Sequence, residues 1–410
     1  MRVTGASRYV VVLMVVASAS AGQPELIGET LLMKIDSRYY GLPWSVRLSP
    51  DGERLLSTRA AAVKQTVSPR PGAGEGRAKK GTQLVLREWR TGREAAIPGP
   101  LLTDAFATHH SMIPDPFSAD GKLVVVPAGI DRDGDGLCVA GKEEIQPAVY
   151  HVETGKLRRV AVRGFRMFAT FDAAGKHLIS TVAGKTQPMA GKTYVAPVGT
   201  LKPTVLSSWG VPLAARPGGS TLALMQIIVP PDGGTPAPKF VLYDFVKDAK
   251  VADIPFETST MPPFFVAKWT SDGRYLYYLD VQPRAAGEGD RPRSQTGVWT
   301  RVWDVQEGKE VVRLPDWLPI GPCSGATTMV LSKAPQGIGG LAFLHDARTQ
   351  EAQPLTGSTC RCNSCNRRHE QDPSARIHPI NTSGKYLIYD RKNERGEHLV
   401  CRAEIETRPK

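Results

Sequence analysis

A short acidic segment has the side chains and the spacing to bind a divalent cation. Residues 131–136 read DRDGDG, with carboxylates at alternate positions and two glycines that permit a sharp turn. Alternate side chains of such a loop converge on one point, and Ca²⁺ prefers several oxygen ligands. The segment therefore predicts a calcium site of structural role, with three acidic ligands: Asp131, Asp133 and Asp135.

This segment departs from a complete calcium loop at its end. A full loop carries Glu at its twelfth position, which here is Lys142, and Glu143 and Glu144 follow one and two residues late. The flanking sequence indicates no helices, so an EF-hand domain is not expected. An acidic turn, whose carboxylates accept hydrogen bonds from their own backbone, is the alternative interpretation.

A second cluster lies near the C-terminus and consists of Cys360, Cys362, Cys365 and His369. Three thiolates and an imidazole at this spacing suit a Cys₃His zinc site. Oxidation to disulfides is the other interpretation, and it is favoured if the protein is exported to an oxidising compartment. The total of 6 cysteines is even, the others being Cys138, Cys323 and Cys401. Covalent haem is excluded, because Asn366 rather than a histidine follows Cys365.

The elements that must position these groups are short strands joined by turns. The 33 Pro and 40 Gly are too many for a helical bundle. A turn rich in Asp, Ser and Gly recurs, each time followed by an apolar strand: SPDGERLLSTR from residue 49, SADGKLVVVPAG from 118, DAAGKHLISTV from 172, SDGRYLYYLDV from 271 and TSGKYLIYDR from 382. Glycine tolerates the left-handed backbone of such turns. Weaker copies begin near residues 216 and 323.

A β-hairpin pattern follows most of these turns, for example in segments 84–99, 149–162, 241–255, 302–315 and 343–356. Turn, buried strand and hairpin together make a four-stranded meander. Repeats of this size with four strands each are typical of a β-propeller. We therefore predict an all-β chain with one propeller of seven blades, six or eight remaining open, and with insertions near 64–82, 130–147, 230–239, 283–297 and 358–376.

The turn-strand repeat resembles the WD-like β-propeller repeats of bacterial exported proteins, of the type found in TolB. The closest matches are RLSPDGERL from Arg47 and WTSDGRYL from Trp269. The resemblance covers most of the chain and implies the propeller fold. It does not imply one function, because such propellers serve as scaffolds, binding modules and enzymes.

Histidines suggest an enzymatic alternative. His378 stands directly before Pro379 and the last turn, which resembles in part the arrangement of propeller-type polysaccharide lyases that hold a metal with such histidines. The resemblance implies His109, His110 and His378 as candidate ligands, although Arg376 and Ile377 replace a second histidine nearby. The chain has no G-x-S-x-G elbow, Walker loop or H-E-x-x-H motif, so no nucleotide cofactor is expected.

The N-terminus has the pattern of a secretory signal peptide. Arg2 and Arg8 precede or flank a short apolar run, and Ala19-Ser20-Ala21 fits a cleavage site. The run is too short to span a bilayer, so no transmembrane anchor is expected. We predict a signal peptide over 1–21 and a propeller over 22–410. Its N-terminal strand, within 28–37, is expected to pair with the C-terminal one and close the ring.

The charge favours an acidic partner. Cleavage would lower the formal charge from +12 to +10, and the basic residues concentrate in the insertions. Nucleic acid is disfavoured by the export signal and the absence of a binding motif. We therefore expect a periplasmic or extracellular module that binds a protein or an anionic glycan, with a metal-dependent polysaccharide lyase as the alternative.

Overall fold

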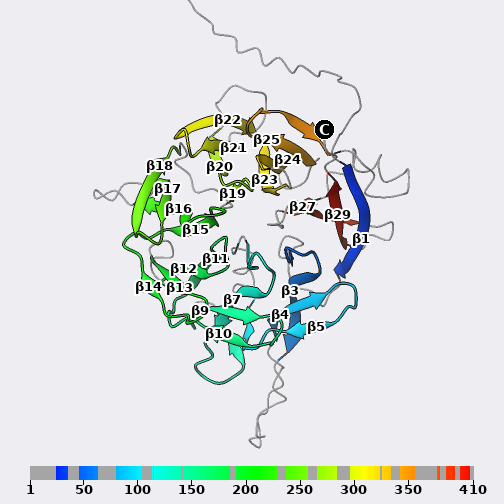
Figure 1. Ribbon diagram of the computed structural model, residues 1–410. Coiled ribbons are helices and arrows are strands. Elements are labelled where there is room, and N and C mark those ends of the chain that lie inside the picture. The colour runs from blue at the N-terminus through cyan, green and yellow to red at the C-terminus, as the bar shows by residue number, and fades with distance from the viewer. Residues whose placement is uncertain are drawn as a thin grey trace, which may run out of the picture.

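The computed structural model describes residues 25–35, 46–62, 80–103, 113, 115–139, 142–184, 191–228, 237–256, 266–283, 296–323, 326–333, 342–355, 376–378, 385–392 and 398–406. The described chain is all-β, with strands in seven sheets arranged as a ring (Figure 1). It contains no helix of the length and apolar character needed to cross a membrane.

The recurrent turns fold through one hydrogen-bond circuit. In the turn after residue 118, the Ser118 hydroxyl donates to Asp120 at 2.6 Å and accepts from the backbone N–H of Leu123 at 3.0 Å. The same side chain of Asp120 accepts from the N–H of Lys122 at 3.1 Å. Gly121 has a φ of 69°, which glycine adopts without strain. Equivalent circuits occur at Ser49–Asp51 and Thr270–Asp272, so the sequence repeat is a structural repeat.

Each blade is an antiparallel meander that starts near the axis. Blade 1 has β2 (Arg47–Leu48), β3 (Arg54–Ala62), β4 (Lys80–Glu88) and β5 (Glu94–Ala96), extended by β6 (Leu101–Leu102) and β8 (Leu137–Cys138). Blade 2 has β7 (Leu123–Gly129), β9 (Ile145–His151) and β10 (Leu157–Arg159), with an inner bridge from Phe117 to Val124. Blade 3 has β11 (Arg166–Phe171), β12 (His177–Ala183), β13 (Gly191–Pro197) and β14 (Thr204–Val205).

The remaining blades follow the same plan. Blade 4 has β15 (Val211–Ala215), β16 (Thr221–Ile228), β17 (Ala237–Asp244) and β18 (Ala249–Ile254). Blade 5 has β19 (Ala267–Trp269), β20 (Tyr275–Pro283), β21 (Thr296–Asp304) and β22 (Lys309–Pro315). Blade 6 has β23 (Trp317–Pro322), β24 (Thr328–Lys333), β25 (Ala342–Asp346) and β26 (Ala352–Pro354). The predicted seven-bladed propeller is confirmed.

Blade 7 combines both ends of the described chain. Its inner strands are β27 (Arg376–His378), β28 (Tyr386–Lys392) and β29 (His398–Glu406), and β1 (Glu25–Ile35) forms the outer edge (Figure 1). β1 is antiparallel to β29, from Glu25 opposite Glu406 to Ile35 opposite His398. The N-terminal strand therefore begins three residues earlier than the segment 28–37 in which the sequence analysis places it.

Blades 7 and 1 meet at the turn that contains Gly52. The Gly52 carbonyl accepts hydrogen bonds from Arg402 Nη1 at 2.6 Å and from Trp89 Nε1 at 2.8 Å. The Arg402 guanidinium lies over the rings of Trp89 and Tyr386, 4.4 and 4.5 Å from their centroids. Cation–π contacts and charged hydrogen bonds of a buried Arg are stabilising, so this cluster joins the first blade to the last.

Strand direction defines two faces of the ring. In blades 1 to 5 the first strand runs toward the turn that leads into the second strand, and the third strand runs toward the hairpin turn before the fourth, so both turns lie at one end of the blade, here called the turn face. The second strand ends, and the third begins, at the opposite end. The basic segments 64–80 and 284–293 follow β3 and β20 in the sequence, and all of their residues but Lys80 lie outside the described residues.

A candidate binding cavity in the central channel

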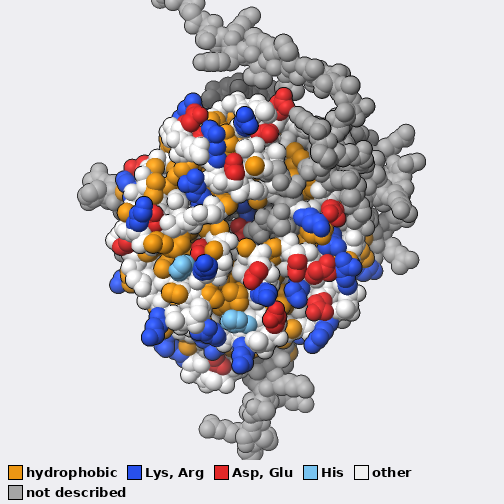
Figure 2. All heavy atoms as spheres, viewed as in Figure 1, with side chains coloured by type: hydrophobic (Ala, Val, Ile, Leu, Met, Phe, Trp, Pro, Cys, Tyr) orange, Lys and Arg blue, Asp and Glu red, His pale blue; other side chains and the backbone are white. Residues whose placement is uncertain are grey.

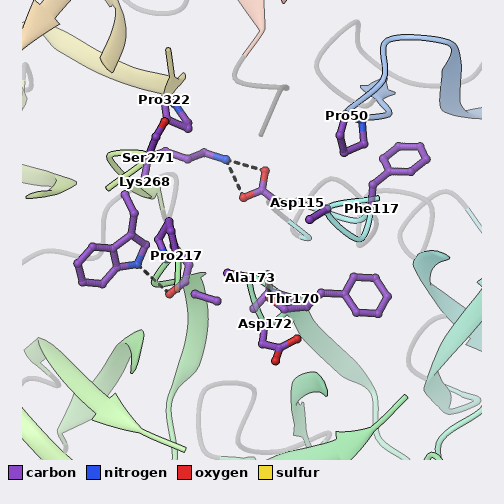
Figure 3. Close-up of a pocket in the computed structure, with 15 residues that line it drawn as sticks. Pro50, Asp115, Phe117, Thr170, Asp172, Ala173, Pro217, Lys268, Ser271 and Pro322 are labelled. Carbon is purple, nitrogen blue, oxygen red and sulfur yellow. Dashed lines mark hydrogen bonds and ion pairs between the residues drawn. The ribbon is translucent and has the colours of Figure 1, made fainter. Parts of the chain in front are cut away.

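A cavity of about 350 Å³ lies in the channel near the turn face (Figure 3). Its walls come from the inner strands and turns of six blades: Pro50, Asp115, Phe117, Ala119, Thr170, Phe171, Asp172, Ala173, Ala214, Ala215, Pro217, Lys268, Trp269, Ser271 and Pro322. This volume is within the range of small-molecule sites. Residues far apart in sequence meet here because each blade contributes the end of its first strand.

An ion pair crosses the channel at this cavity. Lys268 Nζ of β19 donates to both carboxylate oxygens of Asp115, at 2.8 and 3.0 Å (Figure 3). The Lys268 side chain is 5% exposed and that of Asp115 17%. Asp115 precedes the inner segment of blade 2 whereas Lys268 belongs to blade 5, so the pair links blades that are not neighbours in the ring.

A second buried cation lies close to this pair. Arg47 of β2 is buried, and its desolvation lowers the pKa of the guanidinium to about 10, although the charge of Asp115 opposes the shift. At neutral pH the Arg47 side chain is still protonated. The carboxylate of Asp115 thus lies near two buried cations, Arg47 and Lys268.

The other side-chain donors that line the cavity are engaged with backbone carbonyls. Three side chains donate in this way, at 3.2, 3.0 and 3.3 Å respectively: Thr170 to Phe171, Ser271 to Cys323 and Trp269 to Ala214. Asp172 accepts from the backbone N–H groups of Lys176 and His177 and contacts His177 Nδ1 at 3.0 Å. Among the described lining side chains, Lys268 is therefore the one with an N–H donor beyond these bonds.

Most of the remaining wall is apolar. The rings of Phe117, Phe171 and Trp269 are at least nine-tenths buried, and Ala214 and Pro217 lie beside Trp269. On the face shown in Figure 2, hydrophobic side chains gather toward the middle of the ring, while Lys and Arg lie mainly along its rim. Apolar side chains therefore make up most of the cavity wall, which also carries three charged residues: Asp115, Asp172 and Lys268.

The acidic loop follows β7 and lies apart from this cavity. The carboxylates of Asp131, Asp133 and Glu143 offer ligand atoms within 4.8 Å of one another, which makes a possible acidic metal site. Asp135, which the sequence also predicts as a ligand, is outside this group and accepts from the N–H of Leu137 at 2.8 Å. The candidate ligand that the sequence analysis does not assign is Glu143, which lies one position after the expected one.

Backbone hydrogen bonds shape this loop as well. Asp131 accepts from the N–H groups of Gly134 and Gly136 at 2.8 and 2.7 Å. The buried Glu143 accepts from those of Arg132 and Val139, at 2.9 and 2.8 Å. These bonds are the ones expected for an acidic turn whose carboxylates accept from their own backbone. They also hold the carboxylates of Asp131 and Glu143 close together.

The other predicted site residues are described in part or not at all. His109, His110, Cys360, Cys362, Cys365 and His369 lie outside the described residues. His378 belongs to β27, of which only the backbone is described. Cys138, Cys323 and Cys401 are buried in separate blades, and no disulfide joins these three. No histidine is among the described residues that line the cavity.

Sequence reasoning missed the channel residues, yet the repeat carries a signal for them. Arg47 and Lys268 each stand two positions before the hydroxyl residue that opens the turn, Ser49 and Thr270 respectively. Thr170 occupies the same position before Asp172. Two of these three residues line the cavity and the third lies near Asp115. Aligning the repeats on their turns would thus have identified charged residues in the channel.

Comparisons with known proteins found likeness in structure alone. No family model and no curated protein matches the chain. An acylaminoacyl peptidase from Pyrococcus horikoshii has a TM-score of 0.46 at 12% identity over 70% of this chain, which spans 44% of the peptidase. An oligogalacturonate lyase in complex with manganese has a TM-score of 0.46 at 13% identity, over 94% of this chain and 99% of the lyase. TolB from Acinetobacter baumannii has a TM-score of 0.36 at 12% identity, over 85% of this chain and 81% of TolB.

Proposed function

We propose that this chain is an exported β-propeller that acts as a binding module for an anionic partner, which contacts the protein at the channel cavity. The observation that carries the proposal is the buried Lys268–Asp115 pair at the wall of a cavity of about 350 Å³. The surplus of basic residues in the insertions supports an acidic partner on grounds of charge.

The cost of burying charge is the physical reason for this assignment. Removing a cation from water is unfavourable unless an anion or several hydrogen bonds compensate for it. Lys268 is paired with Asp115, and the buried Arg47 feels the charge of the same carboxylate. An acid in the cavity would accept a hydrogen bond from the buried ammonium of Lys268 and gain its Coulomb attraction, which a neutral ligand lacks.

A binding screen tests the proposal. Trigalacturonate, an acidic peptide and small carboxylic acids are titrated into the protein by calorimetry, together with uncharged analogues. The proposal expects an acid to bind with an affinity that falls in Lys268→Met, which keeps the chain length and removes the charge. Lys156→Met removes an exposed charge elsewhere and serves as the control. Acid binding that Lys268→Met leaves unchanged would contradict the proposal.

Export rests on the pattern of residues 1–21. N-terminal sequencing of the protein recovered from the periplasm or the medium tests this part. A mature chain that begins at or near Gly22 agrees with export. An intact Met1 on extracellular or periplasmic protein contradicts cleavage.

A structural calcium ion at the acidic loop is a second proposal, carried by the grouping of Asp131, Asp133 and Glu143. The loop is followed directly by β8, which pairs with β6 of blade 1, so a bound ion would brace two blades. We expect Ca²⁺ to raise the melting temperature of the wild type but not of Asp133→Asn. The exposed Glu153→Gln is the matched control. An equal effect of Ca²⁺ on Asp133→Asn and the wild type would refute the site.

A further inference from the structure

We infer that the acid that enters the channel cavity is a small monocarboxylate with a compact apolar body, held by Lys268 in competition with Asp115. This inference rests on the proposed function and narrows its ligand class. It follows from three features of the cavity: the donors it offers, the walls that surround them, and the position of Asp115.

The first feature is the donor count. A lysine ammonium carries three N–H donors, and the two oxygens of Asp115 account for two of those on Lys268. One donor remains for an acceptor in the cavity. The hydroxyls of Thr170 and Ser271 and the indole N–H of Trp269 already donate to backbone carbonyls. Within the described lining, a ligand therefore meets one charged donor and several acceptors.

This count disfavours a sugar chain as the occupant. Each sugar hydroxyl that leaves water needs a hydrogen-bond partner, and a buried polar group without one costs free energy. The described lining offers one side-chain donor to such a ligand. A monocarboxylate concentrates its polar atoms at one end, where Lys268 donates, and leaves fewer polar groups to be satisfied than a sugar does.

The second feature is the apolar wall. Phe117 and Phe171 come from blades 2 and 3, and Trp269 comes from blade 5. Ala214 and Pro217 of blade 4 complete the wall between them. Transfer of an apolar body from water to such a surface is favourable in proportion to the area buried. The wall thus suits an aromatic or aliphatic body attached to the acid.

The third feature is the competing carboxylate. Asp115 occupies the same ammonium group that the ligand would use, and its side chain is more exposed than that of Lys268. A ligand carboxylate must share Lys268 with it and is repelled by its negative charge. Replacing Asp115 by asparagine keeps the side-chain size and removes this repulsion. The affinity for an acid should then rise, which is the opposite of what losing a binding contact does.

The test compares 4-phenylbutyrate with 4-phenylbutan-1-ol, which has the same body without the charge, and with trigalacturonate. Calorimetry measures each dissociation constant for the wild type, Asp115→Asn and Lys268→Met. We expect the wild type to prefer the acid over the alcohol by about tenfold or more, since hydrogen bonds to charged groups exceed neutral ones. Asp115→Asn should bind the acid more tightly and the alcohol unchanged, and Lys268→Met should lose the preference.

The possible outcomes separate a failure of this inference from a failure of the proposed function. Equal binding of acid and alcohol in the wild type overturns the inference. So does Lys268-dependent binding of trigalacturonate without binding of 4-phenylbutyrate, although the proposed function survives that result. Binding of no acid through Lys268 overturns both. If a single variant fails to fold, the wild-type comparison of acid and alcohol still decides, and the double variant Asp115→Asn/Lys268→Met, which removes both members of the ion pair together, supplies the control.

Discussion

Replacing Gly52 by alanine should destabilise the ring far more than the same change at Gly218. Both glycines lie in turns after a first strand, with φ of 75° and 70°. An alanine there adopts a left-handed backbone at a cost of about 1–2 kcal/mol. A Cβ at position 218 meets no atom within 4 Å, so this cost is the whole effect expected.

At position 52 the added methyl group meets the cluster that joins blades 7 and 1. The Cβ would lie 2.7 Å from Arg402 Nη1 and 2.9 Å from Tyr386 Cδ2, closer than packed atoms allow. Arg402 must then give up its 2.6 Å hydrogen bond to the Gly52 carbonyl, and hydrogen bonds to charged groups contribute about 1.5–3 kcal/mol. We expect Gly52→Ala to cost about 2 kcal/mol more than Gly218→Ala.

Urea unfolding, followed by tryptophan fluorescence, measures this difference. Trp89 belongs to the cluster and reports on it directly. The comparison of two glycines with the same backbone conformation removes the left-handed penalty from the result. Equal free energies of unfolding for the two variants would show that the Gly52 turn is not held against blade 7, and the account of how the ring is joined would be wrong.

Three further predictions concern buried groups. Burial lowers the pKa of His345 to about 4, so only the unfolded chain takes up this proton between pH 6.5 and 4. As the pH falls through that window, the free energy of unfolding measured with urea should decrease by about 3 kcal/mol. The decrease should be smaller in His345→Gln, and an equal decrease in both proteins would exclude His345 as the cause. Arg301→Met removes the 3.0 Å ion pair with the buried Asp280 and should lower the free energy of unfolding by about 3–5 kcal/mol. Arg90→Met removes an exposed pair and should lower it by under about 1 kcal/mol in the same measurement. Similar losses in the two variants would contradict this prediction. Burial raises the pKa of Cys138 to about 11, so iodoacetamide at pH 8 should label it only in urea, as peptide mass spectrometry detects; native labelling would contradict its burial.

The fold could be predicted from the sequence because it is encoded locally and repeatedly. The Ser-x-Asp-Gly pattern specifies a turn through contacts within six residues, as the Ser118 circuit shows. Repetition of that turn then implies a ring of blades. The weak copies near residues 216 and 323 directly follow the first strands of blades 4 and 6, where the strand pairing persists without the full turn motif.

The candidate site could be predicted only in part. The acidic loop is recognisable because its ligands are close in sequence, although Glu143 was missed because the loop departs by one position from the familiar spacing. The channel pair could not be predicted, because Lys268 and Asp115 are 153 positions apart and meet only when the ring closes. Neither residue belongs to a sequence motif from which the other could be inferred. The position of Lys268 relative to its turn indicates only that its side chain faces the channel.

A crystal structure with 4-(4-bromophenyl)butyrate tests the central claim most directly, since the bromine can be located from its anomalous signal. The account predicts a bromine peak within the channel cavity, beside Phe117, Phe171 or Trp269, and a carboxylate within hydrogen-bond distance of Lys268 Nζ. Crystals saturated with the acid that show the cavity without it, or the acid bound only elsewhere, would contradict the account.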